Sequence, residues 1–384
     1  MRNKVLILVA AAMGLSFATS GANAVPSFAS KTEKNCSYCH TAWPQLNAKG
    51  RAYKEAGYRL PAEIGKDTGN FLEQGEFPIS AILVTRPYDK KDSGDHKVRA
   101  LHEAEVIIAA SIGKNLSGFF ELEAEDEDTN ARGLEVGIPA AQITYSYSPE
   151  FNAQVSYGGM FYADPYGFLG DHFRLTRGHV GFIDQSFGGA DGKIRDARQN
   201  VTVYGRVQKK FFYMAGYSGP AKDAEGVDAG TFLVRGAYDI MENVMVGGFY
   251  VNGDNGTAGR EFTRTGIDFS ADYQDFRIAG AWVTADDDTD PLFPPVSETS
   301  NTAMSVQGSY FVRSKSGRPT MVPTVRWDRY EKNDGSDEYS ELTLNFAFYP
   351  LQYAKVYLEY WDRFDVPVGM SEDSRVTLQG AIAF

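Results

Sequence analysis

Apolar and polar residues alternate with a period of two, segment after segment, from residue 77 to residue 384. Within 339–348, for example, Leu344 and Phe346 share one parity and Asn345 takes the other. This period predicts β-strands that each present one apolar face and one polar face. A soluble β-sandwich alternates in the same way, so the connections between the strands must decide between a sandwich and a barrel.

The alternation defines about sixteen candidate strands. They lie near 77–86, 98–112, 115–125, 137–148, 151–161, 196–208, 211–218, 229–240, 243–252, 262–274, 276–285, 303–313, 319–330, 337–349, 353–364 and 374–384. Residues 172–184 can be counted as a further strand, and an added pair would make eighteen.

The connections between these strands are short and long in turn. Tight turns fall at Gly113, Pro149, Lys209, Met241, Asp275 and Pro350, and longer polar loops fall at 87–97, 126–136, 162–195, 286–302 and 365–373. Short turns at one end and long loops at the other are typical of outer-membrane barrels. An open sheet edge cannot lie in lipid, so the sheet must close. The expected fold is therefore all-β, a transmembrane antiparallel β-barrel of about sixteen strands over 77–384.

Residues 1–24 have the features of a secretory signal peptide. Arg2 and Lys4 precede an apolar run, and small residues end the segment at Ala24. We therefore expect an exported protein, and loss of Arg2 and Lys4 changes the formal net charge from -12 to -14. So acidic a chain is not expected to bind nucleic acid.

Cys36, Cys39 and His40 form the run Cys-x-x-Cys-His, the attachment sequence of a c-type haem. The two thiols add to the haem vinyl groups, and the histidine binds the iron from one side. An exported chain also permits a disulfide between the two cysteines. Because His40 follows directly and the chain has no other cysteine, we predict one covalent haem c on these residues, with His40 as an axial iron ligand.

Residues 25–76 form a short segment and linker between the signal and the first strand. The stretch 25–66 has a net charge of +4. Residues 45–56 are predicted to form a helix that Gly57 ends in the left-handed conformation. So short a segment buries too little surface to enclose a haem by itself. The sequence therefore predicts that it plugs the lumen of the barrel, which sixteen strands leave wide enough.

Glu103, Glu105, Glu121 and Glu123 fall on the polar parity of two neighbouring strands. The tight turn near Lys114 places Glu105 opposite Glu123, and like charges directly opposed destabilise a strand pair. Lumen arginines, the basic plug or a metal cation must offset these charges. Two interpretations stay open: an ordinary charge network, or a path for a divalent first-row cation, which hard oxygen ligands suit.

The second axial position of the iron has no ligand in residues 25–76, which contain one histidine and no methionine. Candidates elsewhere are Met160, on a lumen-facing parity, and His172 and His179, in the longest loop. His102 has the apolar parity of its strand and is expected to face lipid. Either one of the first three binds the iron, or the iron is five-coordinate or carries water.

The haem-motif segment resembles the fused cytochrome–porin family, the outer-membrane iron oxidases of iron-oxidising bacteria. The family pattern runs from A-x-P-x-F-A through the haem motif to P-x-L-N, then a G-R and a G-Y pair. It stands here as Ala24, Pro26, Phe28 and Ala29, then Cys36, Cys39 and His40, then Pro44, Leu46 and Asn47, then Gly50, Arg51, Gly57 and Tyr58. The chain departs from it at Ser30, Lys31 and Tyr53, and none of these positions touches haem chemistry.

This resemblance implies a location in the outer membrane of a Gram-negative bacterium, with the loops extracellular and the N-terminus in the periplasm or the lumen. It implies one-electron oxidation of extracellular ferrous iron, with electrons passing through the haem to a periplasmic carrier such as a soluble cytochrome c. Haem attachment carries over to Cys36, Cys39 and His40. No iron-binding residue of the barrel carries over, so Glu103, Glu105, Glu121 and Glu123 remain candidates from their charge alone.

Two other functions fit the same sequence. One is a conduit for a different extracellular donor or acceptor, or peroxide chemistry at an open haem. The other is a transport porin whose haem-bearing segment acts as a plug or a redox gate. Outer-sphere electron transfer makes no bonds, so oxidation of ferrous iron by this conduit needs no general acid or nucleophile.

Overall fold

A computed structural model describes residues 27–32, 34–67, 69, 78–126, 133–169, 174–184, 193–220, 230–254, 261–287, 299–332, 335 and 337–384. The predicted signal peptide, 1–24, lies outside the described residues. Within the described ranges, every helix is too short or too polar to cross a membrane.

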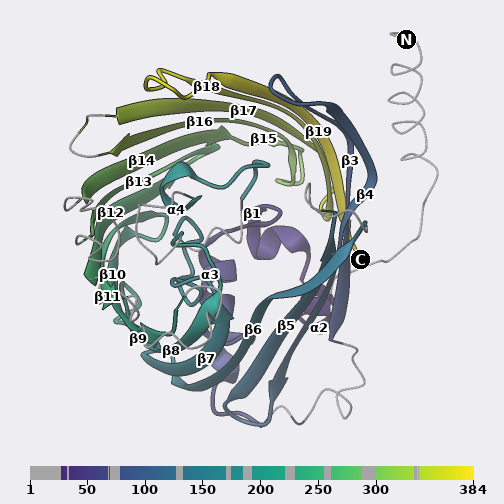
Figure 1. Cartoon of the computed structure of the whole chain (residues 1–384). Helices are drawn as coiled ribbons and strands as arrows, with labels where there is room; N and C mark the ends of the chain where they lie inside the picture. The colour runs from purple at the N-terminus through teal and green to yellow at the C-terminus, as the bar shows by residue number, and fades with distance from the viewer. Residues whose placement is uncertain are drawn as a thin grey trace.

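The strands β3 to β19 form one closed antiparallel barrel (Figure 1). Their bounds are Ile79–Lys91 (β3), His96–Ile112 (β4), Leu116–Glu125 (β5), Glu135–Ser148 (β6), Phe151–Gly158 (β7), Arg198–Val207 (β8), Phe211–Ser218 (β9), Gly230–Met241 (β10), Val244–Asp254 (β11), Glu261–Tyr273 (β12), Phe276–Asp287 (β13), Thr299–Tyr310 (β14), Val312–Arg313 (β15), Pro319–Lys332 (β16), Asp337–Leu351 (β17), Ala354–Phe364 (β18) and Asp373–Ala383 (β19). Strand β15 continues β14, because both pair with β16, so the wall has sixteen strands. The pairing of β19 with β3 closes it. The predicted fold is therefore confirmed.

Two details of the strand prediction are wrong. The expected loop at 87–97 is mostly strand, because β3 extends to Lys91 and β4 begins at His96. Residues 174–184 contribute no strand; they belong to a connection that folds into the barrel and contains the short helix α4 (Gly181–Asp184). The wall therefore has sixteen strands within the described residues, and residues 172 and 173 of the suggested strand lie outside them.

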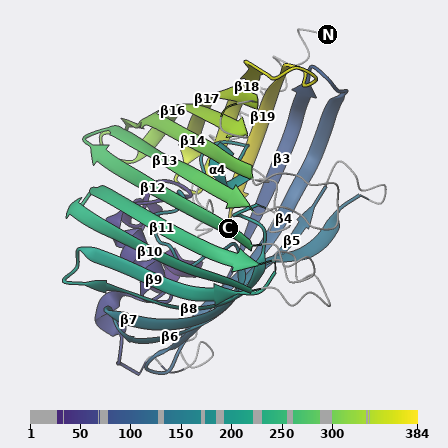
Figure 2. The same cartoon turned by 60° about the vertical axis from the view of Figure 1, so that its left-hand side comes forward.

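The alternating residues face lipid and lumen as their polarity requires. On β17, Leu344 and Phe346 are 41% and 50% exposed on the outside, whereas Thr343 and Asn345 are 1% and 3% exposed on the inside. The strands run obliquely around the wall, as barrel closure demands (Figure 2). Exposed aromatic side chains collect next to the short turns: Tyr147, Phe151, Phe211, Tyr238, Tyr273, Phe276 and Tyr310. Such a band is typical of a membrane–water interface.

The N-terminal segment lies inside this ring of strands (Figure 1). We call residues 27–67 the plug. It contains helices α2 (Ser27–Thr32) and α3 (Ala48–Glu55), the 3-10 turns Cys36–Tyr38 and Pro61–Glu63, and the small hairpin of β1 (His40–Ala42) and β2 (Gln45–Leu46). The predicted helix at 45–56 is confirmed except for its first residues, and Gly57 has the expected left-handed φ of 69°.

The plug is held at the end of the barrel where the connections are short. Arg51 donates to the carbonyl of Glu242 in the β10–β11 turn at 3.1 Å. Arg59 donates to the carbonyl of Lys114 in the β4–β5 turn at 2.6 Å. Both ends of the barrel wall, at Ile79 and Ala383, lie at this same end.

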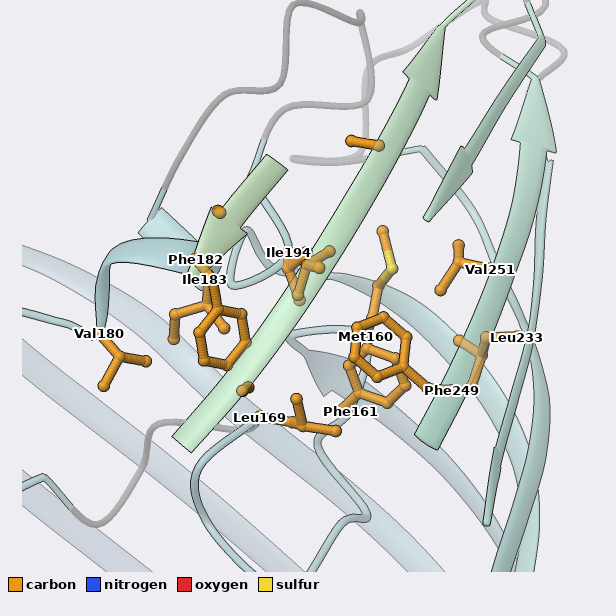
Figure 3. Close-up of a cluster of buried hydrophobic side chains, with 14 of the residues drawn as sticks. Met160, Phe161, Leu169, Val180, Phe182, Ile183, Ile194, Leu233, Phe249 and Val251 are labelled. Carbon is orange, nitrogen blue, oxygen red and sulfur yellow. The ribbon is translucent and has the colours of Figure 1, made fainter. Parts of the chain in front are cut away.

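The long connection between β7 and β8 fills much of the remaining lumen. Its buried apolar side chains form a core with the inward residues of the wall (Figure 3). Met160, for example, lies among Phe161, Phe249 and Val251. Loops that fold inward in this way narrow a barrel.

We predict that the long-loop end faces the outside of the cell. An epitope inserted in 126–136 or 286–302 should be labelled on intact cells, because the strands that these connections join end opposite the plug. An epitope between Lys209 and Lys210, in a short turn, should be labelled only after the cells are permeabilised. Labelling in the reverse pattern would contradict the orientation.

Candidate haem-binding site

The Cys-x-x-Cys-His loop is tied to the start of helix α3 by Asn47. The Asn47 side chain accepts hydrogen bonds from the backbone N–H groups of Lys49 and Gly50, so it caps the helix. Its amide nitrogen donates to the carbonyl of Tyr38 at 3.0 Å, and its backbone N–H donates to the carbonyl of Cys39 at 2.9 Å. One residue therefore holds the helix against the loop that carries both cysteines.

Gly50 lets the helix approach this loop closely. A Cβ atom at this position would lie 2.2 Å from the carbonyl oxygen of Cys39. No side chain fits there without moving the loop or the helix. The packing thus explains why glycine stands before Arg51 in this segment.

His40 is oriented by the turn that follows it. Its Nδ1 lies 2.8 Å from the carbonyl oxygen of Pro44, which can only accept, so Nδ1 carries the proton. The lone pair is then on Nε2, the arrangement of a metal-binding histidine. Burial lowers the pKa of His40 to about 4, so the ring is neutral at pH 7. A neutral ring is the form that binds iron.

Cys36 and Cys39 are free thiols. Burial raises the pKa of Cys39 to about 11, and it raises that of Cys36 as well. A redox-active Cys-x-x-Cys pair has a lowered thiol pKa, so this environment does not favour dithiol exchange. Two free thiols beside a histidine whose lone pair is on Nε2 fit the attachment of a haem c.

Three strands of the barrel wall contact the haem-motif loop just after His40. Arg277 on β13 donates to Thr41 Oγ1 at 3.2 Å. Tyr349 on β17 donates to the carbonyl of Trp43 at 3.0 Å, and Lys355 on β18 lies 5.4 Å from the Trp43 ring. Leu175 of the long connection belongs to the same buried cluster as Trp43. His40 is thus flanked by residues that pack against three wall strands.

A cluster around Tyr166 joins the plug, the long connection and the wall. The guanidinium groups of Arg51, Arg206 and Arg235 lie 5.2, 5.3 and 5.8 Å from the centre of the Tyr166 ring. The Tyr166 hydroxyl donates to Asp239 at 3.0 Å. Arginines over an aromatic face are attracted by the ring quadrupole. We call these five residues the Tyr166 cluster.

Further ion pairs and hydrogen bonds join the Tyr166 cluster to Lys54 and Glu55 of helix α3. Arg206 donates to Glu55 at 2.9 Å. Lys54 donates to the carbonyl of Asp164 at 2.8 Å, and the Asp164 carboxylate lies 3.3 Å from Arg235. Removing one partner of such a buried set leaves a charge unpaired and is strongly destabilising. The sequence patterns did not reveal this cluster, because its members are scattered over 51–239.

The structure brings the predicted lumen carboxylates together. Glu105 pairs with Glu123 across β4 and β5, and Glu103 pairs with Glu125. Their positive neighbours are Arg174 of the long connection, which interacts with Glu121, and Lys355, which interacts with Glu103 and Glu105. The plug's buried Arg51, Lys54 and Arg59 instead bind backbone carbonyls. The charges are therefore offset by the wall and the long connection, as a charge network requires.

His102 does not face lipid, so that prediction is wrong. It is 2% exposed, and its Nε2 lies 3.2 Å from Oε1 of Glu125. The register between β3 and β4 shifts next to it: Val84 pairs with Glu103, but Arg86 pairs with Arg99. Strand β4 thus carries extra residues here, and such a bulge turns a side chain to the other face.

The candidates for the second axial ligand do not converge on His40. Met160 packs in an apolar cluster that contains no described residue of the plug (Figure 3). His179 lies 3.3 Å from Arg174, four residues beyond Leu175. His172 lies outside the described residues. Of the two described candidates, His179 is the one in a stretch that packs near the haem-motif loop.

Comparison with solved structures finds outer-membrane porins. The anion-selective porin of Comamonas acidovorans matches with a TM-score of 0.57 and 15% identity, over 80% of this chain and 98% of the porin. The loop-deleted OmpT of Vibrio cholerae matches with a TM-score of 0.56 and 15% identity over the same shares. The channel DcaP of Acinetobacter baumannii matches with a TM-score of 0.55 and 13% identity, over 83% of this chain and 99% of DcaP. The chain has the fold of outer-membrane porins.

Comparison by sequence adds no further relative. No protein-family model matches the chain, and no curated protein matches it.

Replacing Gly50 tests the contact between helix α3 and the haem-motif loop. Gly50→Ala should destabilise this packing by about 1–3 kcal/mol, since the added methyl overlaps the Cys39 carbonyl. Trypsin should then cut faster after Arg51 and Lys54, both of which are buried. Gly308→Ala is the matched control, because a Cβ there meets nothing within 4 Å. Equal cleavage rates for the two variants would contradict the close contact.

Proposed function

We propose that the chain is an electron conduit of the outer membrane of a Gram-negative bacterium. Cys36 and Cys39 would hold a haem c covalently and His40 would bind its iron, and this haem would supply a one-electron couple between extracellular ferrous iron and a periplasmic carrier such as a soluble cytochrome c. The observation that carries the proposal is the His40 geometry: Nδ1 donates to the Pro44 carbonyl, which leaves the lone pair on Nε2, and two free thiols lie in the same loop.

Each partner changes by one electron in this reaction. A haem held by Cys36, Cys39 and His40 would supply a one-electron couple, so that each ferrous ion oxidised to ferric would deliver one electron to the carrier. The chain itself supplies the position: the plug holds the motif at the short-turn end, where a periplasmic carrier would dock, and the barrel isolates it from lipid.

The acidic lumen wall supports an approach of ferrous iron from the long-loop end. Glu103, Glu105, Glu121 and Glu123 lie on β4 and β5, and Glu125 ends β5 at that end of the barrel. A wall of one charge sign raises the local concentration of a cation of the opposite sign. Their oxygen atoms suit a divalent first-row ion in transit.

The second axial ligand is proposed to be His179, with His172 and Met160 as the other candidates and a five-coordinate or water-bound iron as the remaining state. Leu175, four residues before His179, shares a buried cluster with Ala42 and Trp43 of the haem-motif loop, and this supports His179. A low-spin ferric spectrum that is lost in His179→Ala and kept in Met160→Leu would support this assignment.

A transport porin with a plug is the second candidate function. The fold likeness to an anion-selective porin and to the channel DcaP supports it more directly than it supports electron transfer. The long connection folded into the lumen suits a channel constriction as well. Stable open steps of the wild-type protein in a planar bilayer would favour the porin, since the plugged conduit is expected to conduct little.

Ferrous reduction of the haem tests the conduit. Ferrous iron should reduce the oxidised protein in a saturable way, and Glu105→Gln with Glu123→Gln should weaken that saturation roughly tenfold. Haem content and the rate of reduction by dithionite should not change. Glu135→Gln, at an exposed site on the same end of the barrel, is the control.

Three outcomes of this test are decisive. No reduction by ferrous iron would contradict the proposed donor. Loss of haem or of barrel stability in the double variant would show that the glutamates are structural. An unchanged saturation curve would remove them from the iron path.

A further inference from the structure

His102, Glu103 and Glu125 form a cluster on the lumen wall, where β4 and β5 pair near the long-loop end. One ligand atom from each of the three side chains lies within 4.8 Å of the other two. His102 and Glu103 are neighbours on β4, and Glu125 is the cross-strand partner of Glu103 on β5. The three side chains therefore come from rigid, paired backbone rather than from loops.

The His102 ring points to a missing partner. It is 2% exposed, and neither of its nitrogens makes a hydrogen bond within the described part of the chain. Nε2 lies 3.2 Å from Glu125 Oε1, within the range of an ion pair when the ring is protonated. A buried polar atom with no hydrogen bond costs free energy. A ligand that accepts the imidazole lone pair would remove that cost.

The carboxylates next to His102 also call for a cation. Glu103 faces Glu125, and Glu105 faces Glu123 in the next pair of the ladder. Directly opposed like charges destabilise a strand pair. Arg86 interacts with Glu125, and Lys355 interacts with Glu103 and Glu105. A bound ion between Glu103 and Glu125 would relieve the repulsion at the pair that His102 adjoins.

We propose that His102, Glu103 and Glu125 bind one divalent first-row transition-metal ion on the lumen wall near the long-loop mouth. One imidazole nitrogen and two carboxylates form a mixed donor set that suits iron, cobalt or zinc better than magnesium or calcium. The backbone N–H of Asp126 donates to the His102 carbonyl at 2.8 Å, so the site lies where β5 ends and the outer loop begins. The site stands on this geometry alone. Only its occupant in the cell, ferrous iron, rests on the function proposed above.

Calorimetric titration with Co²⁺ tests the site without reducing the haem. The full-length protein, purified in detergent without a polyhistidine tag, should bind one Co²⁺ per chain. His102→Gln and Glu125→Gln should each weaken Co²⁺ binding by about tenfold or more. A loss of about tenfold is the smallest that is typical even when a residue supporting a metal ligand is replaced. Glu121→Gln is the matched control: it removes one charge from the same strand, outside the three ligands, and should change the affinity by less than about twofold. Unboiled gels confirm that each variant is a folded barrel.

Two results would overturn the site. One is the absence of saturable Co²⁺ binding to the wild-type protein. The other is equal weakening by Glu121→Gln and Glu125→Gln, which would show a diffuse attraction to the acidic wall. Haem content, measured on the same samples, separates this inference from the proposed function. Haem without a Co²⁺ site contradicts the site alone, and a Co²⁺ site in protein that carries no haem contradicts the conduit alone.

Discussion

The closure of the sheet between β19 and β3 is the constraint from which the rest of the structure follows. In lipid, every backbone N–H and C=O of the wall must find its partner within the protein, and only a closed ladder provides this. Closure with sixteen strands encloses a lumen wider than wall side chains fill. The chain fills that space with its own N-terminal segment and with the connection between β7 and β8.

The segments that enter the lumen are held there by apolar packing against inward wall residues and by polar contacts. The Tyr166 cluster does this where the plug, the long connection and the wall meet. Helix α3 contributes Arg51 to this cluster, and its Glu55 binds Arg206. The same helix is attached to the haem-motif loop through Asn47 and Gly50. The position of His40 in the lumen therefore depends on charge pairs two helical turns away. The ion pairs of Glu55 with Arg206 and of Asp164 with Arg235 therefore have a structural role.

The sequence predicted the wall well and the lumen poorly. The period of two and the turn signals identified all sixteen strands and the pairing of Glu105 with Glu123, because lipid and lumen impose opposite polarities on neighbouring residues. His102 was misplaced because a bulge in β4 breaks that period. The partners of Arg206 and Tyr166 were invisible, because contacts between loop, plug and wall follow no local pattern. Cys36, Cys39 and His40 were identified by their spacing in the sequence. The structure shows why Pro44 and Asn47 stand near them: the Pro44 carbonyl orients His40, and Asn47 caps helix α3.

The intact mass of the mature protein tests the central claim, that the plug inside a porin-fold barrel carries a haem c on Cys36 and Cys39. Denatured mass spectrometry of protein purified from a host that matures c-type cytochromes should give the polypeptide plus one haem. Cys36→Ala with Cys39→Ala should give the polypeptide alone. A wild-type mass equal to the bare polypeptide, or lighter by the two hydrogens that a disulfide removes, would contradict the account and leave the barrel as a porin with a plug.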